Sequence, residues 1–139
     1  MRLYQQDFLE ISQTNTQLIM KELREQFYRY QDRIDSPEIH HYEQETISMQ
    51  SVRKHLVCKD GFQFSCQASE THYCTPKQNG LPAKKYKTWE LGAVSHNDTL
   101  IEEYDESYGW RDARIEVTVY PQVPTNVVLK LIKKHEGLV

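Results

Sequence analysis

A predicted β-hairpin constrains the fold of this chain more than any other part of its sequence. Two segments with β-like composition, residues 52–58 and 62–68, flank Lys59-Asp60-Gly61. An Asp-Gly pair is favoured where a hairpin turn requires a positive φ angle. In the second segment apolar residues alternate with polar ones from Phe62 onward, so one face of the hairpin is apolar. The rest of the chain must therefore supply a layer that covers this face.

A long amphipathic helix near the N-terminus is the predicted covering layer, from about Thr16 to Ile34. A capping signal at residues 14–17 precedes it, and Ser36-Pro37 interrupts it. Residues 3–11 fit either a helical turn or a strand. The apolar residues with near-helical spacing are Ile19, Leu23, Phe27, Tyr30 and Ile34. The opposite face of this helix is charged and fits either a solvated surface or a basic rim that faces a ligand or partner. Its charged residues are Lys21, Arg24, Glu25, Arg29 and Arg33.

Further strands are predicted after the hairpin. Residues 86–93 resume β-like composition after a turn at 79–82, and residues 99–104 read as another strand. A polar loop is expected at 105–112. Residues 113–120 then alternate between apolar and polar side chains, which is the clearest strand pattern in the chain.

A short helix is predicted at the C-terminus, beginning near Val123-Pro124 and stopping at Gly137. Its apolar residues fit packing onto the sheet or an interface between copies of the chain; they are Val127, Val128, Leu131 and Ile132. These patterns predict the α+β class, with a mainly antiparallel β-sheet, a long N-terminal amphipathic helix and a short C-terminal helix. We expect a single domain over residues 1–139, with a helical region at 1–50 followed by the sheet and final helix at 51–139.

Composition narrows the class of protein. No run approaches the about 20 apolar residues of a membrane span, and the N-terminus lacks the apolar stretch of a secretory signal, so we expect a cytoplasmic protein without a membrane partner. The formal charge of −3 argues against broad binding of nucleic acid. The odd number of cysteines indicates reduced thiols rather than a disulfide framework; they are Cys58, Cys66 and Cys74.

The segment after the hairpin, residues 67–77, is the predicted ligand site because it carries more aromatic and titratable side chains than a plain connection needs. Aromatic rings here and downstream could stack on a base, and lysines could contact phosphate. Core packing is the alternative for Trp89, and a solvated rim is the alternative for the lysines. The predicted ligand-binding residues are His72, Tyr73, Thr75, Lys77, Tyr86, Trp89, Asn97 and Asp98.

Two other chemistries fit this segment less well. The cysteines are eight residues apart without a Cys-x-x-Cys pair, which disfavours structural zinc. A nucleophile made of Cys74 with His72 or His96 lacks a recognisable oxyanion site or a glycine-rich loop. We therefore expect no metal site, no cofactor and no catalytic residue.

Residues 52–137 resemble small phage proteins, and the chain is identified as similar to the phage anti-Thoeris family that sequesters cyclic ADP-ribose signals. The resemblance rests on Asp60-Gly61-Phe62-Gln63-Phe64-Ser65, His72-Tyr73-Cys74-Thr75-Pro76-Lys77, Glu90-Leu91-Gly92 and the segment from Val123-Pro124 to Gly137. It implies a noncatalytic homo-oligomer in the bacterial host cytosol that binds a small nucleotide-derived ligand. The basic residue after the Pro is Lys77, where Arg would give bidentate phosphate contact.

Two further functions remain open from the residues alone. The acidic run at 102–106 could mimic the charge of nucleic acid in a protein-directed inhibitor of a host defence complex, of the anti-restriction or anti-CRISPR type. A small hydrolase that depends on His72 is the third hypothesis.

Overall fold

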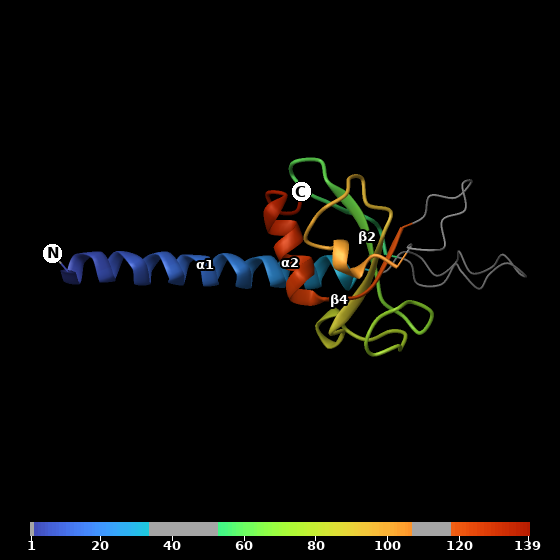
Figure 1. Cartoon of the computed structure of the whole chain (residues 1–139). Coiled ribbons are helices and arrows are strands. Elements are labelled where there is room, and N and C mark those ends of the chain that lie inside the picture. Colours follow the sequence, from blue (N-terminus) through green and yellow to red (C-terminus); the bar gives the residue numbers. More distant parts are fainter. Residues whose placement is uncertain (1, 34–52, 107–117) are drawn as a thin grey trace, which may run out of the picture.

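Two helices and a four-stranded antiparallel sheet form the described part of the chain, in the order β1-β2-β3-β4 across the sheet (Figure 1). The computed structural model describes residues 2–33, 53–106 and 118–139, and of residues 2–13 only the helical backbone. The elements are α1 Arg2–Gln31, β1 Leu56–Val57, β2 Gln63–Gln67, the 3-10 helix η3 Ala83–Lys85, β3 Thr88–Gly92, the 3-10 helix η4 Glu102–Tyr104, β4 Val119–Pro124 and α2 Thr125–Lys134. The predicted α+β class, with a long first helix and a short last one, is confirmed.

The hairpin forms where the sequence predicts it. Gly61 has φ +96°, and its N–H donates to the Cys58 carbonyl at 2.9 Å. The Asp60 carboxylate accepts the Phe62 N–H at 2.9 Å, which closes the turn from the other side. Pairing places Leu56 opposite Phe64, although β1 is only two residues long.

The later elements depart from the predicted boundaries. The expected strand at 99–104 is wrong: these residues form a turn followed by η4. The Asp98 carboxylate accepts the Leu100 N–H, and the Asp98 carbonyl accepts the Ile101 N–H, so local hydrogen bonds curl the backbone instead of extending it. Val123 and Pro124 end β4 rather than begin the helix, and α2 starts at Thr125. Residues 113–117 of the predicted strand, residues 107–112 of the predicted loop, and the predicted helix stop at 34–37 lie outside the described residues.

Helix α1 is longer than predicted, because it begins at Arg2 and includes residues 3–11. The capping signal at 14–17 lies inside it, where those polar side chains are exposed. At 30 residues the helix is about 45 Å long. Its N-terminal end lies far from the sheet, and its C-terminal part lies beside α2 and the sheet (Figure 1). Among the described side chains of α1, Leu23 and Phe27 of this C-terminal part are buried in the core.

The core joins both helices to one face of the sheet. The Phe27 ring meets the edge of Trp89 at a centroid distance of 5.3 Å, and Trp89 lies at the same distance from Tyr86. On α2, Val128, Leu131 and Ile132 are fully buried. Packing within the chain therefore accounts for these three residues of the apolar face, and Val127 is partly buried against the same core.

A buried arginine ties these layers together. Arg53 is 2% exposed, and its Nε donates to the Gln31 carbonyl at 2.6 Å while Nη1 donates to the Ala68 carbonyl at 2.8 Å. Its backbone N–H and carbonyl both bond the Gln67 side chain, which explains why Gln67 is buried despite the polar pattern of β2. The guanidinium carbon lies 5.4 Å from the Trp89 ring centroid. Desolvation lowers the pKa of Arg53 from its usual value.

Replacing Arg53 with Ala should reduce the free energy of unfolding by about 3 kcal/mol, because two buried carbonyls lose their donors and a cavity remains. Urea unfolding measures the change. Arg24→Ala, at an exposed position of α1, is the matched control and should change stability by less than about 0.5 kcal/mol. Equal effects of the two substitutions would contradict this role of Arg53.

Candidate functional site

The eight predicted ligand-binding residues divide into three separate groups in the structure. His72, Tyr73, Thr75 and Lys77 lie together on the loop that follows β2. Tyr86 and Trp89 lie in the core. Asn97 and Asp98 follow β3, which runs antiparallel to β2, so they lie at the opposite end of the sheet from the loop (Figure 1). The predicted site is therefore not one pocket.

The stacking roles predicted for Tyr86 and Trp89 are wrong. Both rings are buried, with exposures of 1% and 0%, and contact Arg53 and each other rather than solvent. The Trp89 Nε1 donates to the Thr125 hydroxyl at 3.0 Å, and the Tyr86 hydroxyl donates to the Gln78 carbonyl. Their polar atoms are thus committed inside the protein. The core alternative for Trp89 is confirmed.

The ligand role predicted for Asp98 is also wrong, because structural contacts occupy its carboxylate. Asp98 is 5% exposed, and Oδ2 lies 2.7 Å from His135 Nε2 while Oδ1 accepts from Lys134 Nζ at 3.0 Å. Its neighbour Asn97 is exposed and follows β3, at the other end of the sheet from the loop of His72. Neither residue can complete a site with Tyr73 or Lys77 in one copy of the chain.

The loop at residues 69–77 is held by an internal network. The buried Ser69 hydroxyl accepts the Thr71 N–H at 3.0 Å and lies 2.6 Å from His72 Nδ1. The Cys74 thiol donates to the Ser69 carbonyl at 3.2 Å. The Glu90 carboxylate of β3 accepts the Tyr73 N–H at 3.2 Å. The loop is therefore a fixed surface rather than a loose connection.

Gln122 fastens this loop to β4, and the sequence analysis did not identify it. Its Oε1 accepts from the hydroxyls of Thr75 and Thr88 at 2.7 and 2.6 Å, and its backbone N–H donates to the Tyr73 carbonyl at 3.0 Å. It has φ +55°, a conformation that non-glycine residues adopt at a cost and often near functional sites. No pattern in the sequence marks it, because the contact depends on how β4 pairs with β3.

The exposed part of the loop combines an aromatic ring with a cation. Tyr73 is 52% exposed, and the Lys77 ammonium lies 5.0 Å from its ring centroid. Thr75 is exposed beside them, and His72 is partly buried with Nε2 4.0 Å from the Glu90 carboxylate. Burial lowers the pKa of His72, while the Glu90 carboxylate partly opposes this shift. A neutral imidazole, a ring face and a cation can together bind a planar anionic group.

The contacts of the cysteines do not support nucleophilic chemistry. Cys74 is buried and its thiol faces the carbonyls of Ser69 and Pro76 rather than His72, and burial raises its pKa. Burial also raises the pKa of Cys66 well above its usual value and that of Cys58 to about 11. Across residues 2–33, 53–106 and 118–139, no group of three or more His, Cys, Asp or Glu side chains is arranged to hold a metal ion.

A histidine held between two carboxylates was another feature that sequence reasoning missed. His135 Nδ1 lies 2.7 Å from Asp60 Oδ2, and the ring stacks on Phe62 at a centroid distance of 3.9 Å. Burial alone would lower the pKa of His135, but hydrogen bonds to Asp60 and Asp98 raise it overall. The Phe62 backbone N–H and then His135 lower the pKa of Asp60. This cluster joins the hairpin turn, the loop after β3 and the end of α2.

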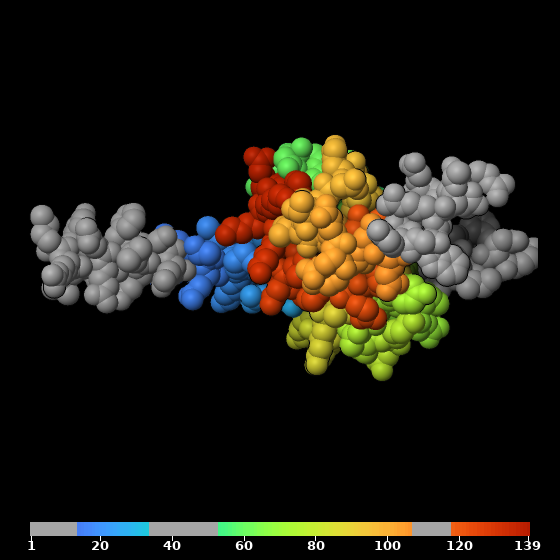
Figure 2. Space-filling model, viewed as in Figure 1, coloured from blue at the N-terminus to red at the C-terminus, as the bar shows by residue number. Residues whose placement is uncertain are grey.

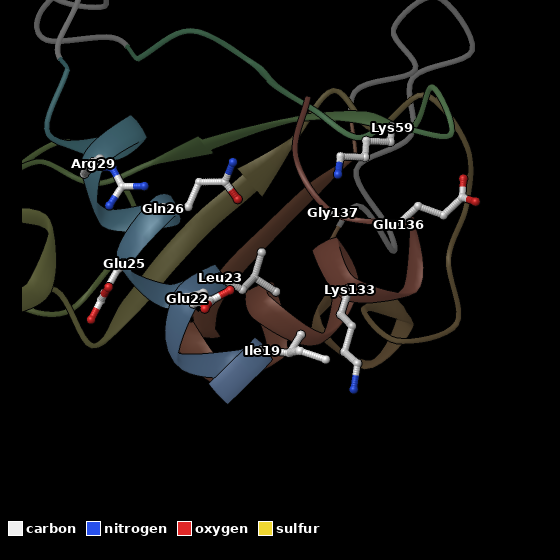
Figure 3. Close-up of a pocket in the computed structure, with 10 residues that line it drawn as sticks. All are labelled: Ile19, Glu22, Leu23, Glu25, Gln26, Arg29, Lys59, Lys133, Glu136 and Gly137. Atoms are coloured by element: carbon white, nitrogen blue, oxygen red, sulfur yellow. The ribbon is translucent and has the colours of Figure 1, made fainter. Parts of the chain in front are cut away.

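A cleft of about 630 Å³ lies between α1 and the C-terminal turn, and none of the eight predicted residues lines it (Figure 3). Its walls come from Ile19, Glu22, Leu23, Glu25, Gln26 and Arg29 of α1 and from Lys59, Lys133, Glu136 and Gly137. This cleft is thus separate from the loop of His72.

Comparisons with protein families, with curated proteins and with solved structures found no match to this chain. Among the helices described here, none has both the length and the apolar character needed to cross a membrane.

The His135 cluster predicts a specific pH dependence of stability. A raised folded-state pKa stabilises the protein fully below the unfolded pKa of about 6.5, and this stabilisation is lost as pH rises through the raised value. The difference in unfolding free energy between wild type and His135→Gln should therefore be larger at about pH 6 than at about pH 9. Chemical denaturation at the two pH values measures it.

The matched control is His72→Gln, because the lowered pKa of His72 has the opposite sign: its protonation favours the unfolded state, so stability falls below about pH 6.5. This substitution should improve relative stability in acid. A pH-independent difference for His135→Gln would contradict the role of the cluster.

Proposed function

We propose that the protein binds a small nucleotide-derived ligand without converting it, at the exposed surface formed by His72, Tyr73, Thr75 and Lys77. By the resemblance of residues 52–137 to phage anti-Thoeris proteins, the ligand class is a cyclic ADP-ribose immune signal, and the role is to sequester it in the host cytosol. Association of several copies is part of the same proposal.

The observation that carries the proposal is the pairing of Tyr73 with Lys77 on a fixed loop. The Tyr73 ring is already 52% exposed, so the protein need not unfold or rearrange to present it to a ligand. Stacking of a base on an aromatic ring contributes about 1–3 kcal/mol to binding. The ammonium 5.0 Å from that ring lies within reach of a phosphate attached to a stacked nucleoside. One ligand could therefore use both side chains.

The surroundings of this pair favour binding over turnover. The loop backbone is tied by Glu90 and Gln122, so little ordering entropy is lost when a ligand binds. The thiol within this loop, that of Cys74, is buried with a raised pKa, and the Ser69 hydroxyl next to His72 is fully buried. Neither group is presented as a nucleophile, which supports sequestration rather than hydrolysis.

Ligand retention tests the proposal directly. The purified protein is incubated with cyclic ADP-ribose isomers, freed of unbound ligand and heated, and the released compound is identified by mass spectrometry. We expect intact ligand from the wild type, and at least about tenfold weaker retention by Tyr73→Ala and Lys77→Ala, since 1.4 kcal/mol corresponds to a factor of ten.

Lys54→Ala removes an exposed lysine outside the loop and should retain ligand like the wild type. Recovery of a hydrolysed product would exclude simple sequestration. Absence of any retained ligand in the wild type would overturn binding of this ligand class.

An acidic surface favours a second candidate function, a protein-directed inhibitor of a host defence complex. Glu102, Glu103 and Glu106 are all exposed on and after η4. A run of exposed carboxylates could mimic a nucleic-acid backbone and occupy a basic site on a partner.

Capture from host lysate distinguishes this candidate. Wild-type protein should retain a nucleic-acid-binding protein, and Glu102→Gln/Glu103→Gln should lose it, with weaker capture at high salt because exposed charges are screened. Glu25→Gln, which changes an exposed carboxylate of α1, is the control. Retention of a nucleotide without any protein would count against the inhibitor.

A further inference from the structure

The part of α1 that extends beyond the sheet and α2 carries an exposed apolar pair. Leu18 and Ile19 are each 51% exposed, whereas Leu23 and Phe27, farther along the same helix, are buried. Figure 2 shows the coloured part of α1, from residue 14 onward, emerging beside α2, and residues 14–19 are all exposed. Helices in proteins gain most of their stability from packing of an apolar face, and this stretch of α1 packs little of its surface against its own chain.

The cleft beside this apolar pair suits a helix better than a compact ligand. Ile19 and Leu23 supply apolar surface, and charged groups of both signs surround it. The charged ends of Arg29, Lys133 and Glu136 point in different directions rather than toward one point (Figure 3). Small-molecule sites instead have a few polar groups that converge on the ligand.

The two walls of the cleft carry opposite net charge. The α1 wall has two carboxylates and one guanidinium, net −1, from Glu22, Glu25 and Arg29. The other wall has two ammonium groups and one carboxylate, net +1, from Lys59, Lys133 and Glu136. Among the described residues no ion pair joins Glu22 or Glu25 to either lysine. The acidic wall of one copy therefore complements the basic wall of another.

We propose that this face of α1 is the surface through which two copies of the chain pair, with their α1 helices side by side and parallel. A parallel two-fold arrangement brings each residue to the same height as its counterpart, so Leu18 and Ile19 meet Leu18 and Ile19 of the second copy. At that height Glu22 and Glu25 of each copy lie beside the Lys59 and Lys133 of the other. Both clefts are filled at once, and the assembly closes as a dimer.

This inference is independent of the ligand, because the surface shares no residue with the loop of His72. It also differs from pairing through α2, whose apolar side chains are buried in the core. Exposed apolar residues at the seam with charged residues at its borders are typical of paired parallel helices.

Sedimentation velocity of the full chain tests the pairing. We expect the wild type at twice the chain mass, and Leu18→Glu/Ile19→Glu at the chain mass. The control Gln17→Glu/Arg24→Gln also makes the net charge of α1 more negative by two, at exposed positions outside the cleft, and should remain a dimer. A wild type that stays monomeric at a protein concentration of about 100 µM, which is about 100 times a micromolar dissociation constant, would overturn the proposal. A folded Leu18→Glu/Ile19→Glu variant that remains dimeric would overturn it too.

A charge reversal tests the contact between the walls. Lys133→Glu should raise the dimer dissociation constant by about tenfold, and Glu22→Lys/Lys133→Glu should restore it, since reversing both partners recreates the pair. Failure of the double variant to recover while it folds normally would contradict the contact of Glu22 with Lys133.

Disulfide cross-linking tests the parallel orientation and does not depend on a destabilising charge. Leu18→Cys should form a cross-linked dimer on mild oxidation, because a parallel seam brings the two residues within disulfide reach of about 4.4–6.8 Å between Cα atoms. The three native cysteines are buried and form no disulfide, so they do not compete in this reaction. Arg24→Cys, at an exposed position on the other side of α1 and outside the cleft, is the control. Equal cross-linking of both variants would overturn the arrangement.

Discussion

The buried guanidinium of Arg53 is the interaction on which the arrangement of the other elements depends. It binds the last residue of α1 through the Gln31 carbonyl and the end of β2 through the Ala68 carbonyl. A buried cation is tolerated only when its donors are paired, so these elements must meet at one relative position. Because Ala68 directly precedes the loop of His72, the same hydrogen bonds fix where that loop begins. The aromatic rings of Tyr86 and Trp89 complete the cation's surroundings, which is why they belong to the core.

Local patterns predicted the fold class well, and tertiary contacts explain the errors. The hairpin follows from Asp60-Gly61 and from alternation in β2, both of which act between neighbouring residues. The strand expected at 99–104 failed because the Asp98 side chain captured the backbone N–H of Leu100. The start of α1 was misplaced because polar residues at 14–17 resemble a cap, although an exposed helix interior also accepts them at a small cost in helix propensity.

The candidate site was predicted only where its residues are close in the sequence. His72, Tyr73, Thr75 and Lys77 do share one loop surface. Trp89 and Leu91 alternate with partly buried Glu90, so strand periodicity favoured the core for Trp89. The contacts of Gln122 with Thr75 and of His135 with Asp60 span 47 and 75 residues. Such contacts depend on strand pairing and helix packing, which no short pattern in the sequence records.

The last residues of the chain also determine how the sheet ends at its outer strand. The Val139 N–H donates to the Val57 carbonyl at 3.0 Å, Cys58 pairs with Leu138, and the Lys59 N–H donates to the Gly137 carbonyl at 2.9 Å. An uncovered edge strand offers unpaired backbone groups to the strands of other molecules. Here the chain's own C-terminal residues occupy those groups along β1. This edge is therefore closed to strand addition, which protects the sheet from edge-to-edge aggregation and directs contact with other molecules to side-chain surfaces.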